Sequence, residues 1–155
     1  MTDALADSGR VDPRLVPASR AQTLRFFIAC CATCAAILVQ AVTAGVFVGK
    51  TGADSWVTVH GLVADLSWVL ALVTAVVGFL SVRRATPRLE YWAIALFVLT
   101  LAQTGLGHLI TDYKDDWVIE VHVPLAMVIF GLTVWITVRA GRLHRVNIGA
   151  PAGVR

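Results

Sequence analysis

The sequence predicts an all-α fold, an integral membrane up-down-up-down four-helix bundle. Composition, four long apolar runs and the placement of the arginines lead to this prediction. Of the 155 residues, 57% are hydrophobic and 15% are charged, whereas a soluble domain is about half apolar and about a quarter charged. A core of this size could not bury so many apolar side chains, so we expect the lipid bilayer to cover the rest.

The four apolar runs are each long enough to cross a bilayer. A span needs about 20 apolar residues, because the hydrocarbon layer is about 30 Å thick and a helix rises about 1.5 Å per residue. We predict spans at residues 24–49, 56–81, 90–111 and 117–139. These runs lack the alternation of β-barrel strands, and their short connections force successive helices to pack antiparallel.

The bundle, residues 23–140, lies between two predicted tails. Residues 1–22 mix Asp, Arg, Pro and Ser without periodicity and are predicted to be a disordered cytoplasmic tail. Residues 141–155 are predicted to be a basic cytoplasmic tail that includes His144. We expect no second domain, because too little soluble sequence remains to form one.

The basic residues are distributed asymmetrically. Arginines precede or open the first span, separate the second span from the third, and follow the fourth: Arg10, Arg14, Arg20, Arg25, Arg83, Arg84, Arg88, Arg139, Arg142, Arg145 and Arg155. The other two connections carry only Lys50 and Lys114. The positive-inside rule therefore predicts a multi-pass protein of the bacterial plasma membrane with both termini cytoplasmic. Because the arginines spread along one membrane face, nucleic acid is a poor candidate partner.

The three cysteines, Cys30, Cys31 and Cys34, lie together in the first span. A CCxxC run could bind a metal or carry redox chemistry. In an apolar span, however, free cysteine usually packs as a small apolar residue. No fourth ligand is evident nearby, so we favour the structural interpretation.

Ionisable side chains inside a membrane span are functional candidates by default. His60 and His122 lie about 6–8 Å below the outer interface, and His108 about 4–5 Å below it. In an antiparallel bundle the second and fourth helices are diagonal, so His60 and His122 face each other across the core. This arrangement suits a planar macrocycle with one axial imidazole on each side. We therefore predict haem b as the cofactor, with His60 and His122 as its metal ligands, His108 as a further cofactor-binding residue, and no catalytic residue.

Small residues predict flat walls beside these histidines. Ala64 follows His60 and Ala126 follows His122 at helical spacing, and Gly105 and Gly107 adjoin His108. The expected inward-facing stripes continue along all four spans. They comprise Ser67, Ala71, Ala75 and Gly78 on the second span, Phe130 and Thr133 on the fourth, Thr100 and Thr104 on the third, and Thr33, Ala36, Gln40 and Thr43 on the first. Small residues admit a flat ligand, but they also admit a neighbouring helix. Hydroxyls among them could hydrogen-bond the far nitrogens of ligating imidazoles.

Two alternatives concern the remaining polar groups. Three histidines in one layer could form a zinc or copper site, but His108 lies nearer the surface, beside an acidic loop that would keep it solvated. Asp65, near the midplane, is either a proton-relay carboxylate or a structural group bonded to Gln40, Thr43 or Gln103. We favour the structural role.

Four segments resemble one half of the haem A synthase family: Ala44-Gly-Val-Phe-Val-Gly-Lys-Thr-Gly52, then His60, then Gln103-Thr-Gly-Leu-Gly107, then Val121-His-Val-Pro-Leu-Ala126. The resemblance covers roughly residues 40–138. It implies a haem-binding scaffold with one ligand on the second helix and one on the fourth, at His60 and His122. The chain is also similar to short, uncharacterised four-helix bacterial membrane proteins with the same histidine pattern.

The departures from that family argue against a complete haem A synthase. The catalytic glutamate that the family carries before its helix 2 histidine is replaced by Val57-Thr58-Val59, and the second half is absent. We therefore predict a bis-histidine haem protein for electron transfer or haem handling. The expected partners are a second copy, as a homodimer, or a membrane redox protein. The alternative is a non-enzymatic membrane subunit that binds a partner protein without a cofactor.

Overall fold

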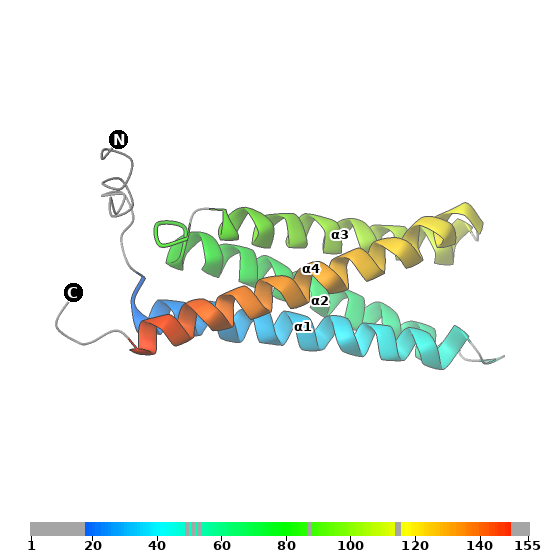
Figure 1. Ribbon diagram of the computed structural model, residues 1–155. Helices are drawn as coiled ribbons and strands as arrows, with labels where there is room; N and C mark the ends of the chain where they lie inside the picture. Colours follow the sequence, from blue (N-terminus) through cyan, green and yellow to red (C-terminus); the bar gives the residue numbers. More distant parts are fainter. Residues whose placement is uncertain are drawn as a thin grey trace, which may run out of the picture.

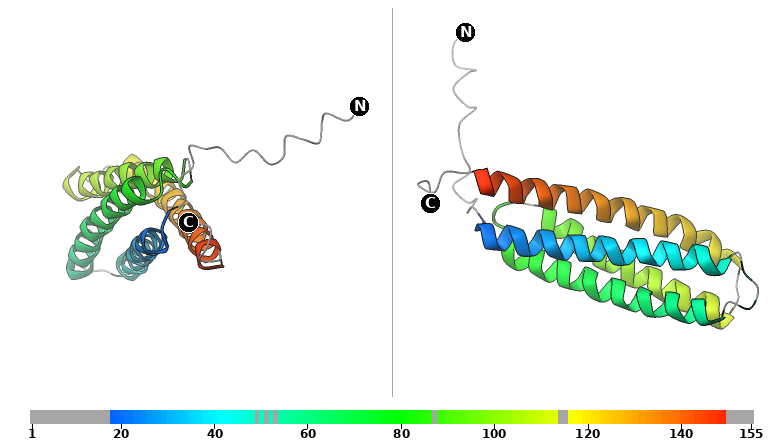
Figure 2. Two further views of the ribbon diagram at one scale, coloured as in Figure 1. Left: turned by 90° about the vertical axis from the view of Figure 1, so that its left-hand side faces the viewer. Right: turned by 90° about the horizontal axis from the view of Figure 1, so that it is seen from below.

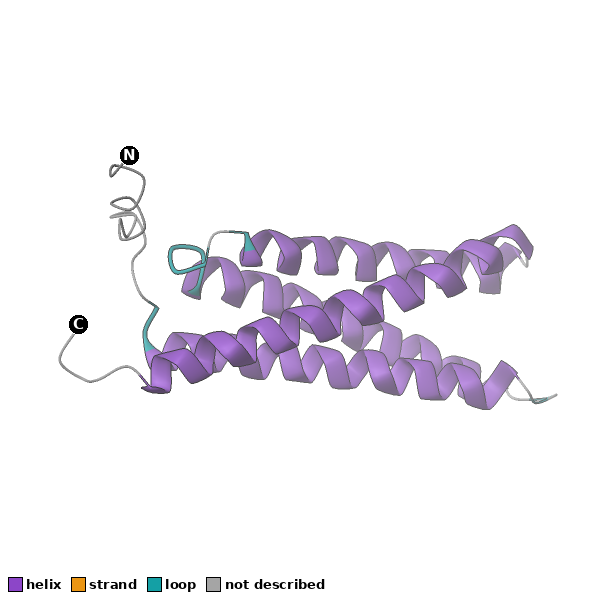
Figure 3. Cartoon of the chain, in the orientation of Figure 1, coloured by secondary structure: helices purple, strands orange, loops and turns teal. Residues whose placement is uncertain are grey.

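The computed structural model describes residues 18–48, 50, 52, 54–86, 88–113 and 116–149. These residues form four helices and no strand: α1 (Arg20–Val48), α2 (Asp54–Ser81), α3 (Leu89–Tyr113) and α4 (Asp116–Gly149). The helices lie lengthwise beside one another (Figure 1), with short loops between them (Figure 3). All four are long and apolar enough to cross a membrane. The prediction of an all-helical chain with four such helices is confirmed.

The helices pack in a ring. α1 packs against α2 and α4, and α3 packs against the same two helices. Figure 2 shows the ring from one end and from below. Neither α1 and α3 nor α2 and α4 contact each other within the described residues. α2 and α4 are therefore diagonal, which is the relation that the two-histidine hypothesis requires.

Small side chains on the inner face of α2 let its neighbours approach closely. The buried stripe consists of Ser67, Ala71, Thr74, Ala75 and Gly78. Gly78 is the tightest position, because a Cβ there would lie 2.9 Å from Cε2 of the fully buried Phe26. The inner face of α4 differs from the expectation at one position: Phe130 is 39% exposed, and Ile129 takes the inward place at 2%.

α1 begins four residues before its predicted start, because a capping box closes its first turn. The backbone N–H of Gln22 donates to Ser19 Oγ at 3.2 Å, and the Ser19 N–H donates to Gln22 Oε1 at 2.7 Å. These two bonds satisfy donors that the start of a helix leaves free.

α4 continues ten residues past the predicted end of the fourth span, through much of the predicted tail. Contacts with α1 explain the difference. His144 Nδ1 lies 3.1 Å from Thr23 Oγ1, and its ring stacks on Phe27 at 6.3 Å between centroids. Asn147 donates to the carbonyl of Ala18 at 2.8 Å. His144 is thus a packing residue of the bundle, and tertiary contacts here offset the low helix propensity of Gly141 and Asn147.

Candidate functional site

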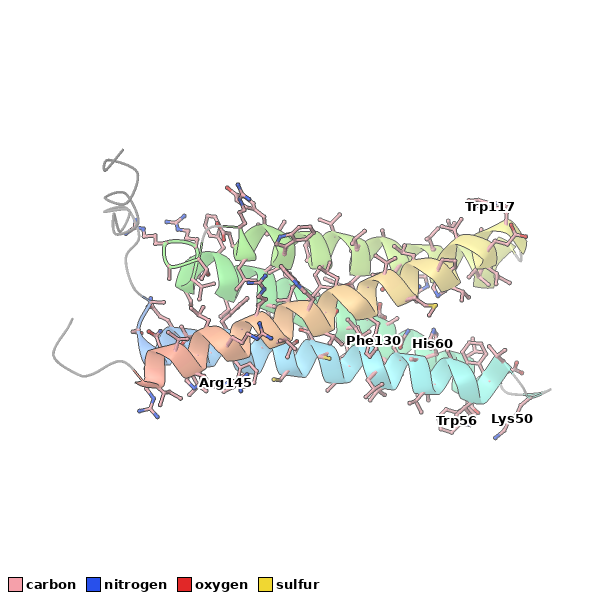
Figure 4. The ribbon with its side chains drawn as sticks, in the orientation of Figure 1. Lys50, Trp56, His60, Trp117, Phe130 and Arg145 are labelled. Carbon is pink, nitrogen blue, oxygen red and sulfur yellow. The ribbon has the colours of Figure 1, made fainter. Side chains whose placement is uncertain are left out.

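His60 projects from α2 and is held by side chains of α1. Its Nδ1 lies 3.0 Å from Thr43 Oγ1, and its Nε2 lies 3.1 Å from the side-chain nitrogen of Gln40. The edge of the Phe47 ring completes the contact, at 5.1 Å between centroids. The prediction that a nearby hydroxyl bonds a histidine ring nitrogen is confirmed at Thr43. Figure 4 shows His60 in the half of the bundle that also carries Trp56 and Trp117.

The hydrogen bonds around His60 define its tautomer. The Thr43 hydroxyl donates its single hydrogen to the backbone carbonyl of Gln40 at 2.9 Å. Thr43 Oγ1 can therefore only accept from His60, which requires a hydrogen on Nδ1. A neutral imidazole carries one N–H, so Nε2 has the free lone pair and accepts from the Gln40 amide. A neutral imidazole with its other nitrogen bonded in this way is the form that ligates metals.

His122 occupies the diagonal helix α4 and contacts α3. A Cβ at Gly107 would lie 3.4 Å from His122 Cε1, so the small residue lets the imidazole lie against the backbone of α3. The side-chain amide of Gln103 donates to the His122 carbonyl at 2.9 Å. Both histidines are half-buried.

Polar atoms without partners gather around these two histidines. Four buried side-chain polar atoms of the described residues have no hydrogen-bond partner, and three belong to this layer: Gln40 Oε1, Gln103 Oε1 and His122 Nδ1. The fourth, Glu90 Oε2, lies at the start of α3. Buried polar groups are normally satisfied. The layer therefore combines an unprotonated imidazole nitrogen, His60 Nε2, with buried groups from α1, α3 and α4 that can still bond a ligand.

The other predicted site residues differ in how deeply they are buried. Ala64 and Ala126 are half-buried, as Gly107 is. Gly105 is exposed, and a Cβ there would meet nothing within 4 Å, so only Gly107 contacts His122. Two residues correspond to about 200° around a helix, which puts the two glycines on opposite sides of α3.

The three-histidine metal site is not formed. His108 is exposed, and the described part of the chain contains no group of three or more His, Cys, Asp or Glu residues that could hold a metal ion. The cysteines likewise belong to no such group among the described residues. Cys30 is buried, Cys31 is exposed and Cys34 is half-buried. The structural interpretation of the CCxxC run is consistent with this placement.

The partners expected for Asp65 were wrong. Gln40 and Thr43 bond His60, and Gln103 bonds the His122 carbonyl. Asp65 is exposed, and it accepts a hydrogen bond from Trp68 Nε1 at 3.3 Å. The sequence analysis placed Gln40 in the inward stripe of the first span, but it missed Gln103 as a site residue and named both amides only as partners of Asp65. Their signal was available, since each is an amide in the helical layer that holds the histidines.

No protein-family model, curated protein or solved structure matches this chain. The resemblance to one half of the haem A synthase family therefore stays a prediction from the short motifs around His60 and His122.

Proposed function

We propose that the chain is an integral protein of the bacterial plasma membrane that binds one b-type haem between His60 and His122. The single observation that carries the proposal is the polar layer between the diagonal helices α2 and α4. There the unprotonated His60 Nε2 accepts from the Gln40 amide, and Gln40, Gln103 and His122 each present a buried atom without a partner. No other described part of the interior concentrates unsatisfied polar atoms in this way.

The residues present fit a bis-histidine haem. Thr43 would orient the His60 ring through its Nδ1–H, and Gly107 would let the His122 ring lie against the backbone of α3. Gln40 must release His60 Nε2 before that atom can bind iron, and the amide is then free to bond elsewhere. A bound haem supplies one-electron redox chemistry, whose potential depends on axial ligands, hydrogen bonding and burial. Electron transfer or haem handling follows as the role, with no catalytic residue.

An up-down-up-down topology with both termini in the cytoplasm is part of the proposal. The alternating direction of successive helices in Figure 1 supports it. Lys50 and Trp117 lie toward one end of the bundle and Arg145 toward the other (Figure 4). Under the positive-inside rule the arginine-rich end faces the cytoplasm, so the histidine layer belongs to the outer half of the membrane.

An absorption spectrum of protein purified from haem-replete cells tests the proposal. We expect a low-spin b-type spectrum that is lost in both His60→Ala and His122→Ala. His108→Ala is the matched control, because this exposed histidine on α3 is expected to leave the spectrum unchanged. A chromophore-free protein, or a spectrum that survives both ligand substitutions, would overturn the assignment.

A further inference from the structure

Asp65 is a carboxyl group on the outer surface of an apolar helix. It lies about 16 Å from the start of α2 and about 24 Å from its end, at about 1.5 Å per residue. The large side chains around it are also exposed: Leu62 by 65%, Leu66 by 52% and Val69 by 40%. In the membrane placement proposed above, on which this inference rests, this face would put an acidic group against lipid at mid-depth.

The chain itself gives the Asp65 carboxyl group few polar partners. Its one hydrogen bond comes from Trp68 Nε1 at 3.3 Å, and it forms no ion pair with any described residue. Most described cations lie near the helix ends, as Figure 4 shows for Lys50 and Arg145, and Arg139, ten residues before the end of α4, covers the Trp135 ring of its own helix. Intramembrane acids are rare, and they almost always pair with another group or face a polar cavity. The group that pairs with the Asp65 carboxyl therefore has to come from another molecule.

We infer that this face of α2 docks a transmembrane helix of a partner protein that presents a lysine or arginine to Asp65. A basic side chain has the charge opposite to that of a carboxylate, so the two groups would pair where no water solvates them. A second copy of this chain offers no cation at this depth and would oppose one Asp65 to another. Gly61, one turn away, favours close approach, because a Cβ there would meet nothing within 4 Å.

Site-specific photo-crosslinking in the cells that produce the chain tests the inference. A photoreactive amino acid replaces Leu62 or Leu66, and the adduct is identified by mass spectrometry. We expect one protein adduct whose transmembrane segment carries Lys or Arg, and we expect Asp65→Asn to abolish it. Asp54→Asn is the matched control, since Asp54 is an exposed acid at the end of the same helix.

Three results overturn the inference: an adduct with a second copy of the chain, an adduct that persists in Asp65→Asn, and the absence of any protein adduct. Two further measurements distinguish a failure of this inference from a failure of the proposed membrane placement or of the proposed haem. Retention of the chain in membranes after alkaline carbonate extraction tests the membrane placement alone. The haem spectrum of Asp65→Asn tests the cofactor alone, and it is expected to stay unchanged because Asp65 has no contact with the histidine layer.

Discussion

The hydrogen bond between Thr43 and His60 gives the sharpest prediction. Thr43→Val preserves the shape of the side chain and removes the oxygen that lies 3.0 Å from His60 Nδ1. The Nδ1–H then loses its acceptor, and the imidazole loses the contact that fixes both its tautomer and its orientation. Leaving such a group unsatisfied costs about 1–3 kcal/mol. Losing an orienting partner of a ligating histidine typically weakens metal binding by about 10–100-fold.

The assay is a titration of haem-free protein with haemin in mild detergent, followed by absorbance. We expect Thr43→Val to weaken haem affinity by about 10–100-fold and Thr43→Ser, which keeps the hydroxyl, to restore most of it. Thr104→Val is the matched control: Thr104 is similarly buried, but its hydroxyl bonds only the Thr100 carbonyl of its own helix. Equal affinities for Thr43→Val and Thr104→Val would refute the reasoning about His60.

Three further predictions concern packing and topology. Gly78→Ala should destabilise the bundle by about 1–3 kcal/mol in thermal unfolding, because the new Cβ meets the fully buried Phe26 ring; unchanged stability would mean that the ring can move. On a background without the native cysteines, Lys50→Cys should react with an impermeant maleimide outside intact cells and Arg83→Cys should not; the opposite pattern would invert the topology. His144→Ala should speed hydrogen exchange in the last two turns of α4 and leave haem binding intact, whereas unaltered exchange would show that the contacts with α1 do not hold this segment.

The overall architecture was predictable because it depends on few physical quantities. The length of the apolar runs predicts the four helices. Their short connections predict neighbouring partners, from which the diagonal relation of α2 and α4 follows. The small residues on the inner face of α2 were likewise readable from helical spacing.

The details that escaped prediction depend on three-dimensional contacts. Residues 141–149 look like a tail by composition, yet they extend α4 because Thr23 and Phe27 receive His144. Gln40 and Gln103 were recognised as polar partners, but they were assigned to Asp65. The rotation of each helix about its axis decides such assignments. Asp65 is on the outer face of α2, whereas Gln40 bonds the His60 ring and Gln103 bonds the His122 carbonyl. Spacing alone gives relative positions on one helix and not the rotation of that helix in the bundle.

The central claim is that one haem is coordinated by His60 and His122. The most direct measurement combines the haem-to-protein ratio of the purified chain with electron paramagnetic resonance of its oxidised form. We predict one haem per chain, with low-spin, six-coordinate iron that carries two imidazole ligands. Haem that is substoichiometric, or high-spin and five-coordinate, would contradict the claim.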